Sequence, residues 1–233
     1  MDEIRCAIIG IGPNDAGKGG CNSIAYAHAW AMRNTAGCVL AAGCARSQAN
    51  RDGFAREFPG VPTYADYREM LARERPALVS ICAWPRDREA MVQAALDAGA
   101  TRLWVEKPMA ITTASARRML AAAAAHGASL VVNHQRRYAQ VVEWMADAVA
   151  AGRIGTVIQA TVVQPCPNLL DFGSHLVDAA LCALPGDRPL RAFAAASVSS
   201  ERRHLGLPQD DQLVGTVHFA SGARLVVESG RQL

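Results

Sequence analysis

The chain has 233 residues, of which 51% are hydrophobic and 19% charged, as in an ordinary globular protein with one sizeable core or two smaller ones. Its net charge of +3 is too small and too scattered for a nucleic-acid surface, which excludes nucleic-acid-binding classes. The longest apolar runs, at 38–45 and 119–125, are far shorter than the ~18 residues that a membrane span needs, so no membrane partner is expected.

The cysteines and the N-terminus indicate a compartment. Seven cysteines, an odd number without a C-x-x-C pair, are typical of reduced and mostly buried thiols. Asp2 and Glu3 precede a single strand-length run, which is the wrong pattern for a secretory signal. We therefore expect a cytoplasmic location. We expect no metal either, because no cluster of His, Cys, Asp or Glu has convincing ligand spacing.

The first 135 residues alternate short apolar runs with helical patterns. Strands are predicted at 4–9, 38–45, 77–83, 102–106 and 129–133, with an extended stretch at 61–64. Helices are predicted from Asn22 or Ser23 to 33, from Ser47 to about 58, from Asp66, and over 86–98 and 113–126. This alternation predicts an α/β fold, a Rossmann doubly wound parallel sheet.

The pattern changes after residue 135. A helix to about 151, a turn at 152–155, a strand at 157–163 and a helix over 171–184 are predicted first. Strand-like segments at 190–199, 211–220 and 223–228 follow, joined by short turns. They predict a small α+β domain with a mainly antiparallel sheet. The sequence thus predicts two domains, 1–135 and 136–233.

A glycine turn, Gly10-Ile11-Gly12, follows the first strand. Glycines at such a place let backbone amides approach a pyrophosphate at a helix N-terminus. We therefore predict that Gly10 and Gly12 bind a dinucleotide and that 1–135 is the dinucleotide-binding domain. Residues 13–22 separate this turn from the helix. Lys18 and the glycines around it either fold over the phosphates or form a mobile surface loop, and the sequence leaves both readings open.

The same stretch nearly matches a phosphate-binding loop. The residues from Gly12 to Gly19 fit G-x-x-x-x-G-K-[ST] except at the last position. The hydroxyl at that position binds Mg²⁺ in a nucleotide triphosphatase, and Gly19 has none. The pattern therefore disfavours a P-loop enzyme.

The residues after the second strand indicate which dinucleotide is bound. An NAD site usually has Asp or Glu there for the ribose hydroxyls, whereas a 2′-phosphate calls for Arg and hydroxyl donors. The chain has Cys44-Ala45-Arg46-Ser47 and then Arg51, without a carboxylate. We predict NADP, with NAD as the alternative, and Arg46, Ser47 and Arg51 as contacts. The alternative reading is that Ser47 caps a helix and Arg46 is simply solvated.

The tripeptide Glu106-Lys107-Pro108 directly follows the apolar run at 103–105. An ionisable pair at the end of a buried strand is costly to desolvate and is more often kept for chemistry than for packing. Pro108 biases Lys107 away from helical geometry, so the lysine should leave the strand in an extended turn. Together with the glycine turn, this tripeptide indicates a redox enzyme.

Taken in order, the motifs resemble those of the Gfo/Idh/MocA oxidoreductases (glucose-fructose oxidoreductase, inositol dehydrogenase and relatives). The matching pieces are Gly10-Ile11-Gly12, Tyr26-Ala27-His28, Val61-Pro62-Thr63-Tyr64-Ala65-Asp66-Tyr67, Pro85, Glu106-Lys107-Pro108, Arg136-Arg137-Tyr138 and Asp171-Phe172-Gly173-Ser174-His175. The resemblance covers nearly the whole chain. It places Ala25 where a third glycine usually stands, and Pro85 and Glu106 beside the cofactor.

The resemblance implies an NADP-dependent dehydrogenase or reductase acting on a small molecule, namely a sugar, polyol or related carbonyl. It implies that Lys107 hydrogen-bonds the reacting oxygen and that His175 exchanges the hydroxyl proton. A spacing of four residues would place Asp171 on the same helical face, where it could orient the imidazole. The structural alternatives are that Asp171 complements the helix dipole and that His175 pairs with Asp178 or is a buried core residue.

Other positions carry weaker signals. Asn133, Gln135 and Arg136 follow a strand end and are predicted substrate contacts, solvated side chains being the alternative. Arg88 stands where many members of the family carry a histidine, and Trp84 replaces a small residue or proline; both either reshape the nicotinamide side of the pocket or only pack.

Family members typically continue past this length with a larger second sheet. A reduced sheet leaves an apolar face and edges that must be covered. We therefore expect a homo-oligomer, namely a dimer through the C-terminal sheet. Two other functions stay open: an NAD-dependent glycoside hydrolase or epimerase that oxidises its substrate transiently, and a non-catalytic cofactor-sensing regulator.

Overall fold

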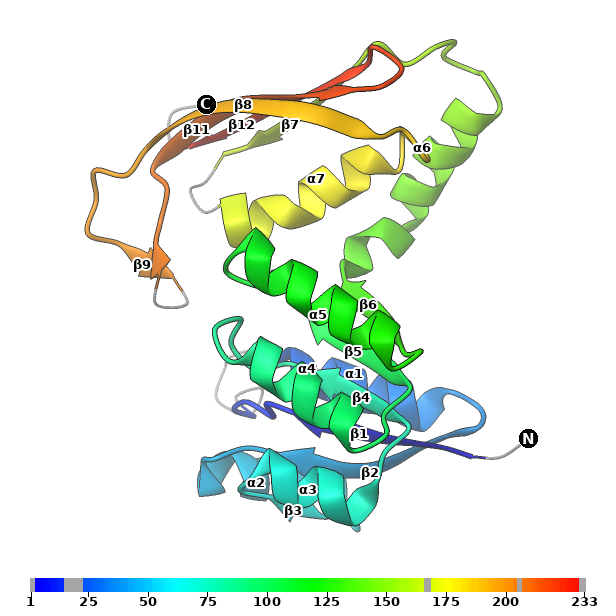
Figure 1. Cartoon of the computed structure of the whole chain (residues 1–233), viewed down its shortest axis with the longest axis vertical. Coiled ribbons are helices and arrows are strands. Elements are labelled where there is room, and N and C mark those ends of the chain that lie inside the picture. Colours follow the sequence, from blue (N-terminus) through cyan, green and yellow to red (C-terminus); the bar gives the residue numbers. More distant parts are fainter. Residues whose placement is uncertain (1–2, 15–22, 166–168, 205–206, 231–233) are drawn as a thin grey trace. The chain divides into compact units, whose positions relative to one another are not determined.

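The structure, a computed structural model, describes residues 3–14, 23–165, 169–204 and 207–230 (Figure 1). The chain divides into two compact units, Met1–Asn133 and His134–Leu233. The boundary predicted after residue 135 lies close to this division.

The first unit is built on a parallel sheet. Its strands are β1 (Ile4–Ile9), β2 (Cys38–Cys44), β3 (Thr63–Tyr64), β4 (Leu78–Ile81), β5 (Arg102–Glu106) and β6 (Ser129–Asn133). The strand order is β3-β2-β1-β4-β5-β6, and every pair is parallel. The order reverses between β1 and β4, which confirms the predicted doubly wound sheet. Because a parallel sheet gathers the carboxyl ends of its strands at one edge, the glycine turn and the Glu106 tripeptide share that edge.

Helices connect the strands of this sheet. They are α1 (Ile24–Asn34), α2 (Gln48–Glu57), α3 (Tyr67–Glu74), α4 (Arg88–Asp97) and α5 (Thr113–Ala125). Local capping explains where several of them begin. The side chain of Ser47 accepts a hydrogen bond from the amide of Asn50 at the start of α2, as predicted, and Asp66 and Thr112 do the same for α3 and α5.

The core of the first unit has two layers, one on each face of the sheet. Alternation along β1 sends Cys6 and Ile8 to one face and Ala7 and Ile9 to the other. On the first face an aromatic cluster fills the space under α1 and α2, made of Tyr26, Phe54 and Phe58 with ring centroids 4.7–6.0 Å apart. On the second face Met70, Val92, Leu96 and Met119 pack on the strands.

The second unit combines helices with a mixed sheet. Its elements are η2 (Gln135–Tyr138), α6 (Gln140–Ala150), β7 (Gln159–Gln164), η3 (Leu169–Gly173), α7 (Ser174–Leu181), β8 (Pro189–Ser197), β9 (Arg203–His204), β10 (Leu207–Pro208), β11 (Gln212–Phe219) and β12 (Arg224–Gly230). The order β7-β12-β11-β8 has two antiparallel pairs, and β7 runs parallel to β12. Leu176, Val177 and Ala180 of α7 pack on one face of this sheet.

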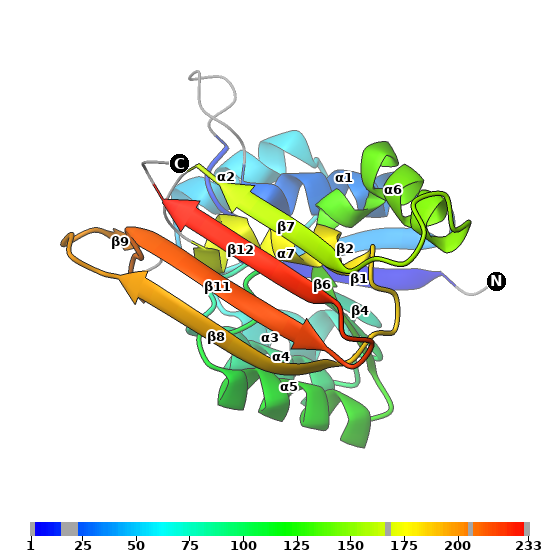
Figure 2. The same ribbon diagram turned by 90° about the horizontal axis from the view of Figure 1, so that it is seen from above.

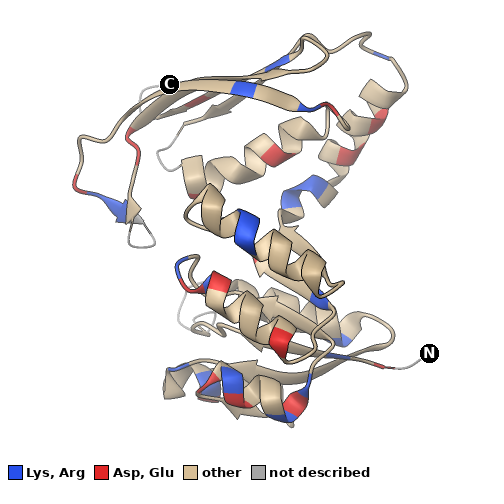
Figure 3. Cartoon of the chain, in the orientation of Figure 1, with Lys and Arg blue, Asp and Glu red and all other residues tan. Residues whose placement is uncertain are grey.

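Among the described residues of the second unit, no helix packs on the opposite face of this sheet. Figure 2 shows the four strands in front, with α7 behind them. Phe193 and Val214 are exposed on this face, and both sides of β8 are exposed along its whole length. The four strands carry few charges, only Arg191, Arg224 and Glu228 (Figure 3). In the strand register these three charged residues lie on the same face as Phe193 and Val214, so the exposed face mixes apolar and charged side chains, whereas an apolar face was expected.

Two details differ from the sequence-based expectation. The helix predicted over 171–184 begins as a π-helix, η3, and becomes α-helical only at Ser174. A two-stranded pair, β9 with β10, stands between β8 and β11 and was not predicted.

Candidate functional site

The glycine turn lies at the carboxyl end of β1. Gly10 has a φ of +97°, and a Cβ there would lie 2.5 Å from the backbone nitrogen of Ala83. The amides of Gly10 and Ile11 both donate to the carbonyl of Cys44, at 2.9 and 3.0 Å. Only glycine fits at position 10, because the turn packs directly on the chain leaving β4.

The start of α1 suits an anionic group. The amide of Gly12 donates to the Ser23 hydroxyl at 3.1 Å, and a Cβ at Gly12 would meet the Ser23 side chain. Ser23 stands at the N-cap position of α1, but its side chain makes no capping bond to the helix. The amide of Tyr26 in the first turn donates to the Ser23 carbonyl at 3.0 Å, and Ala25 is buried in the same turn. The glycine turn and the N-terminus of α1 thus lie together at this strand end. These features fit a dinucleotide pyrophosphate. Lys18 and its neighbours lie outside the described residues.

The three predicted cofactor contacts that follow β2 lie in different environments. Arg46 and Ser47 are exposed. The Arg51 guanidinium donates to the carbonyls of Ala45 and Arg46, at 2.6 and 2.8 Å, and to the side chain of Gln48. Arg51 therefore holds the β2–α2 turn in shape, while Arg46 presents its charge to solvent.

Glu106 is the centre of a buried polar network at the carboxyl ends of β4, β5 and β6. One carboxylate oxygen accepts from the side-chain amide of Asn133 and lies 3.2 Å from Nε2 of His28. The other oxygen accepts from the amide of Lys107 at 3.1 Å. Glu106 is 4% exposed, so a charge here requires these donors. The network fixes the backbone from which the Lys107 side chain leaves.

His28 joins α1 to this network. Its Nδ1 lies 2.7 Å from the Ser80 hydroxyl, and its ring stacks on Trp104 with centroids 3.7 Å apart. The Trp104 indole in turn donates to the side-chain oxygen of Asn133 at 3.2 Å. His28 therefore links α1 to β4, through Ser80, and to the Glu106 carboxylate at the end of β5.

Two groups in this region have shifted pKa values. Burial acts to raise the pKa of Glu106, but the hydrogen bonds from His28 and Asn133 and the charges of His28 and Arg88 outweigh it, so the pKa is lowered. Burial raises the pKa of the Cys82 thiol to about 12. Glu106 is therefore a carboxylate at neutral pH, and the nearby Cys82 is a neutral thiol rather than a nucleophile.

Lys107 is half-buried, and the peptide bond to buried Pro108 is cis. Pro85 is buried in the segment after β4.

Asn133 points its side chain into the Glu106 network, whereas Gln135 and Arg136 are exposed on η2 of the second unit. Among the three predicted substrate contacts, Asn133 is thus already engaged by Glu106 and Trp104.

The second unit holds the other predicted catalytic pair. Asp171 and His175 are buried, at 8% and 3% exposure. Asp171 lies in the π-helix η3 and His175 in the first turn of α7. A π-helix advances by a different angle per residue, so the α-helical spacing argument does not place both on one face. Single π turns recur at functional sites, which agrees with a role for this segment.

Other side chains gather around His175. The ring of His134 meets the ring of His175 edge-on, with centroids 5.6 Å apart. Asp178 accepts from Arg137 at 3.1 Å and lies 3.8 Å from Nδ1 of His134. The carboxylate of Asp178 thus faces η2, whereas the sequence suggested a pairing with His175. The start of η3 is held by Asp210, which accepts from the amide of Leu169 and from the Ser229 hydroxyl.

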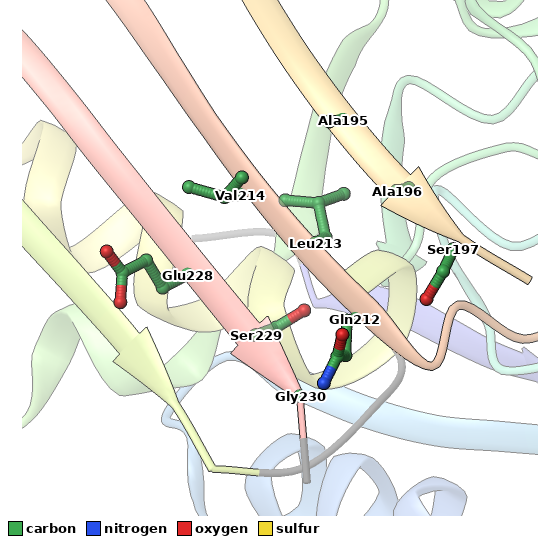
Figure 4. A pocket seen from close by; sticks show the side chains of 9 residues that line it. All are labelled: Ala195, Ala196, Ser197, Gln212, Leu213, Val214, Glu228, Ser229 and Gly230. Carbon is green, nitrogen blue, oxygen red and sulfur yellow. The ribbon is translucent and has the colours of Figure 1, made fainter. Parts of the chain in front are cut away.

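A hollow of about 560 Å³ lies at one end of the second sheet, over β8, β11 and β12 (Figure 4). Its walls are Ala195, Ala196, Ser197, Gln212, Leu213, Val214, Glu228, Ser229 and Gly230. None of the predicted site residues lines it, so we do not assign the chemistry to this hollow.

The guanidinium of Arg88 donates to the carbonyls of Glu106 and Pro108, on either side of Lys107. Sequence reasoning missed this contact, as well as the roles of Trp104, His134 and Asp178. For Arg88 a signal existed. The buried residues of α4 are Arg88, Val92, Ala95 and Leu96, so the arginine continues an apolar stripe at helical spacing. A charged residue on a buried stripe indicates a specific partner.

Two absences apply to the residues that the structure describes. None of their helices has the length and apolar character to cross a membrane. No three His, Cys, Asp or Glu side chains among them are grouped to hold a metal ion.

These observations define the class first: a dinucleotide-binding Rossmann unit followed by an α+β unit. Residues 4–134 match the family model of the Gfo/Idh/MocA oxidoreductases, described as an oxidoreductase family with an NAD-binding Rossmann fold. The chain belongs to this family, which confirms the resemblance seen in its motifs.

Relatives of known name agree with this assignment. The chain is 25% identical to D-glucoside 3-dehydrogenase of Escherichia coli over 97% of its own length and 70% of the relative. It is 31% identical to inositol 2-dehydrogenase of Burkholderia multivorans over 58% of its own length and 41% of the relative. The crystal structure of GenD2 from gentamicin A biosynthesis, in complex with NAD, matches the fold with a TM-score of 0.83 at 21% identity, covering 100% of this chain and 67% of that one.

Proposed function

We propose that the protein is an NAD(P)-dependent oxidoreductase that transfers hydride between the nicotinamide and a carbinol or carbonyl carbon of a sugar or polyol. The observation that carries this proposal is the shared edge of the first sheet. The glycine turn and the start of α1 lie at the end of β1, and Lys107 leaves the end of β5, two strands away in the sheet. The names of the relatives, a glucoside dehydrogenase and an inositol dehydrogenase, support the substrate class.

The residues of the chain would divide the work. The bound nicotinamide would supply the hydride acceptor or donor. Lys107 would hydrogen-bond the reacting oxygen, and the Glu106 network would keep its backbone in place. As hydride leaves the carbon of an alcohol, the hydroxyl proton must leave the oxygen, and His175 would accept it. For Asp171, which is buried in η3 before His175, the role of orienting carboxylate rests on the family resemblance and not on helical spacing. A screen of sugars and polyols that follows NAD(P)H absorbance tests this proposal; no turnover with any of them would contradict it.

For the cofactor we propose NADP in preference to NAD. The turn after β2 exposes Arg46 and the Ser47 hydroxyl and offers no carboxylate between Cys44 and Arg51. An exposed guanidinium there pairs with a 2′-phosphate, and Arg51 keeps the turn in shape. We expect NADPH to bind about tenfold more tightly than NADH, a difference of about 1.4 kcal/mol.

Fluorescence titration with the two reduced nucleotides measures this preference. Arg46→Ala should weaken NADPH binding and leave NADH binding unchanged. The matched control is Arg33→Ala, an arginine exposed on α1, which should change neither. Tighter binding of NADH by the unaltered protein would overturn the assignment.

We also propose that a second copy of the chain covers the uncovered sheet face. Phe193 and Val214 are 60% and 51% exposed there, and the same face carries Arg191, Arg224 and Glu228, whose opposite charges can pair across two copies. An isologous contact would bury both copies of the face at once. Sedimentation velocity should show a dimer that Val214→Glu converts to a monomer, while Trp144→Glu on α6, away from the sheet, leaves it intact. A monomeric unaltered protein would contradict this proposal.

A further inference from the structure

The Arg88 side chain occupies an unusual place for a cation. It is 3% exposed at the first position of α4. Its Nε donates to the carbonyl of Ala83 at 2.7 Å, and its Nη1 donates to the carbonyls of Glu106 and Pro108. Its Nη2 lies 3.5 Å from the carbonyl of Lys107. One guanidinium therefore bonds the segment after β4 and the peptide groups on both sides of Lys107.

Only the planar guanidinium of arginine has enough N–H donors to bond all of these carbonyls at once. Arginine offers five N–H groups in a fixed geometry, whereas lysine is a single mobile point charge and histidine has two ring nitrogens. The carbonyl acceptors come from two segments that are distant in sequence, so the guanidinium fixes one against the other. The cost of burying the charge is offset by these carbonyl dipoles and by the Glu106 carboxylate, whose pKa the Arg88 charge helps to lower.

The turn held in this way carries the proposed catalytic amine. The amide of Lys107 is bonded to the Glu106 carboxylate, and the carbonyls flanking the residue are bonded to Arg88. Fixing the peptide groups on both sides removes backbone freedom at the point where the side chain departs. A displacement of about 1 Å at a reacting group can lower a rate about 100-fold.

We propose that Arg88 is the positioning residue for Lys107: it holds the turn of residues 106–108 so that the amine meets the reacting oxygen. The role of the amine rests on the function proposed above, whereas the holding of the turn does not. Arg88 acts through the backbone and touches neither substrate nor cofactor in this assignment.

The chain makes the test direct because it contains only two lysines, Lys18 and Lys107. In a Lys18→Arg background, reductive ¹³C-methylation labels a single lysine, and its NMR signal reports how ordered the Lys107 side chain is. Amide hydrogen exchange of the peptide that contains residues 106–110 reports the turn itself. Both readouts work without a substrate.

We expect Arg88→Met and Arg88→Lys to raise amide exchange at Lys107 and to narrow the ¹³C signal, while exchange in β1 and β4 stays unchanged. Turnover should fall about 100-fold with the Kd for NADPH within a few-fold of the original. Arg88→Lys keeps the positive charge, so a loss of order in this variant would show that the planar set of guanidinium donors, and not the charge, holds the turn. Added guanidinium should restore turnover in Arg88→Ala. The matched control is Arg118→Met on α5. It removes an exposed guanidinium that is bonded to Glu89, the neighbour of Arg88 on α4, and it should alter neither amide exchange, the ¹³C signal nor turnover.

Unchanged exchange at Lys107, or an increase spread equally over β1 and β4, would overturn the proposal. If Arg88→Met does not fold, Arg88→Lys carries the same comparison. Absence of hydride transfer in the unaltered protein would contradict the proposed function alone, because the exchange and NMR readouts would still decide whether Arg88 holds the turn.

Discussion

Replacement of Lys107 by alanine is expected to lower kcat by about 10²–10⁴-fold, the range that a positioned proton-transfer or hydrogen-bonding group contributes. The side chain is half-buried and leaves the strand edge where the glycine turn also lies. The backbone of Lys107 is bonded through its own amide to Glu106, so loss of the side chain leaves these bonds in place. Steady-state turnover in both directions and NADPH titration measure the two effects.

The Kd for NADPH should stay within a few-fold of its original value, because the pyrophosphate is assigned to the glycine turn and α1. Arg102→Ala is the matched control, since it removes an exposed cation from the same strand, β5. Turnover that survives in Lys107→Ala would remove the lysine from the chemistry. A loss of NADPH affinity as large as the loss of turnover would assign it to cofactor binding instead.

The sheet of the first unit could be predicted because each strand is a short apolar run that ends in a turn signal. Gly10 marks the end of β1, and Gly99 marks the end of the helix α4 before β5; both have positive φ. Once strands and helices alternate, the handedness of the crossovers leaves few topologies. The glycine turn and Glu106-Lys107-Pro108 then had to lie at one edge, and this part of the candidate site followed from sequence alone.

The second unit was less predictable, for local reasons. The π-helix at Leu169–Gly173 has no signature of its own, and the spacing of Asp171 and His175 reads as an ordinary α-helix. The pair β9–β10 has two residues in each strand, too few for any periodicity. The parallel placement of β7 beside β12 depends on long-range packing that a sequence pattern does not encode.

The direction of side chains at the sheet edge was the other limit. Asn133 follows a strand end and was predicted to contact substrate, yet its side chain points back to Glu106 and Trp104. Arg51 was predicted to contact the cofactor, and its guanidinium bonds backbone carbonyls. Both side chains form hydrogen bonds with polar groups that are buried or belong to a turn. A single sequence does not show which polar groups need such a partner.

Replacement of Glu106 is expected to have the largest effect on stability. Glu106→Ala leaves the Asn133 amide, the His28 ring and the Lys107 amide without their acceptor, and removing one member of a buried charged network costs about 3–5 kcal/mol of unfolding free energy. Glu106→Gln keeps the shape but presents an NH₂ group to some of these donors, so it should also destabilise. Urea unfolding at neutral pH measures both.

The loss of unfolding free energy in the Glu106 variants should depend on pH. Folding lowers the pKa of Glu106, so its contribution is fully present above the unfolded-state pKa of about 4.3 and disappears as the pH falls through the lower folded-state pKa. The difference in unfolding free energy between the unaltered protein and Glu106→Gln should therefore be constant near neutrality and shrink on acidification. Glu143→Gln, an exposed carboxylate on α6, is the matched control. A difference that stays constant into acid would show that the Glu106 network holds the Lys107 turn by shape and not by charge.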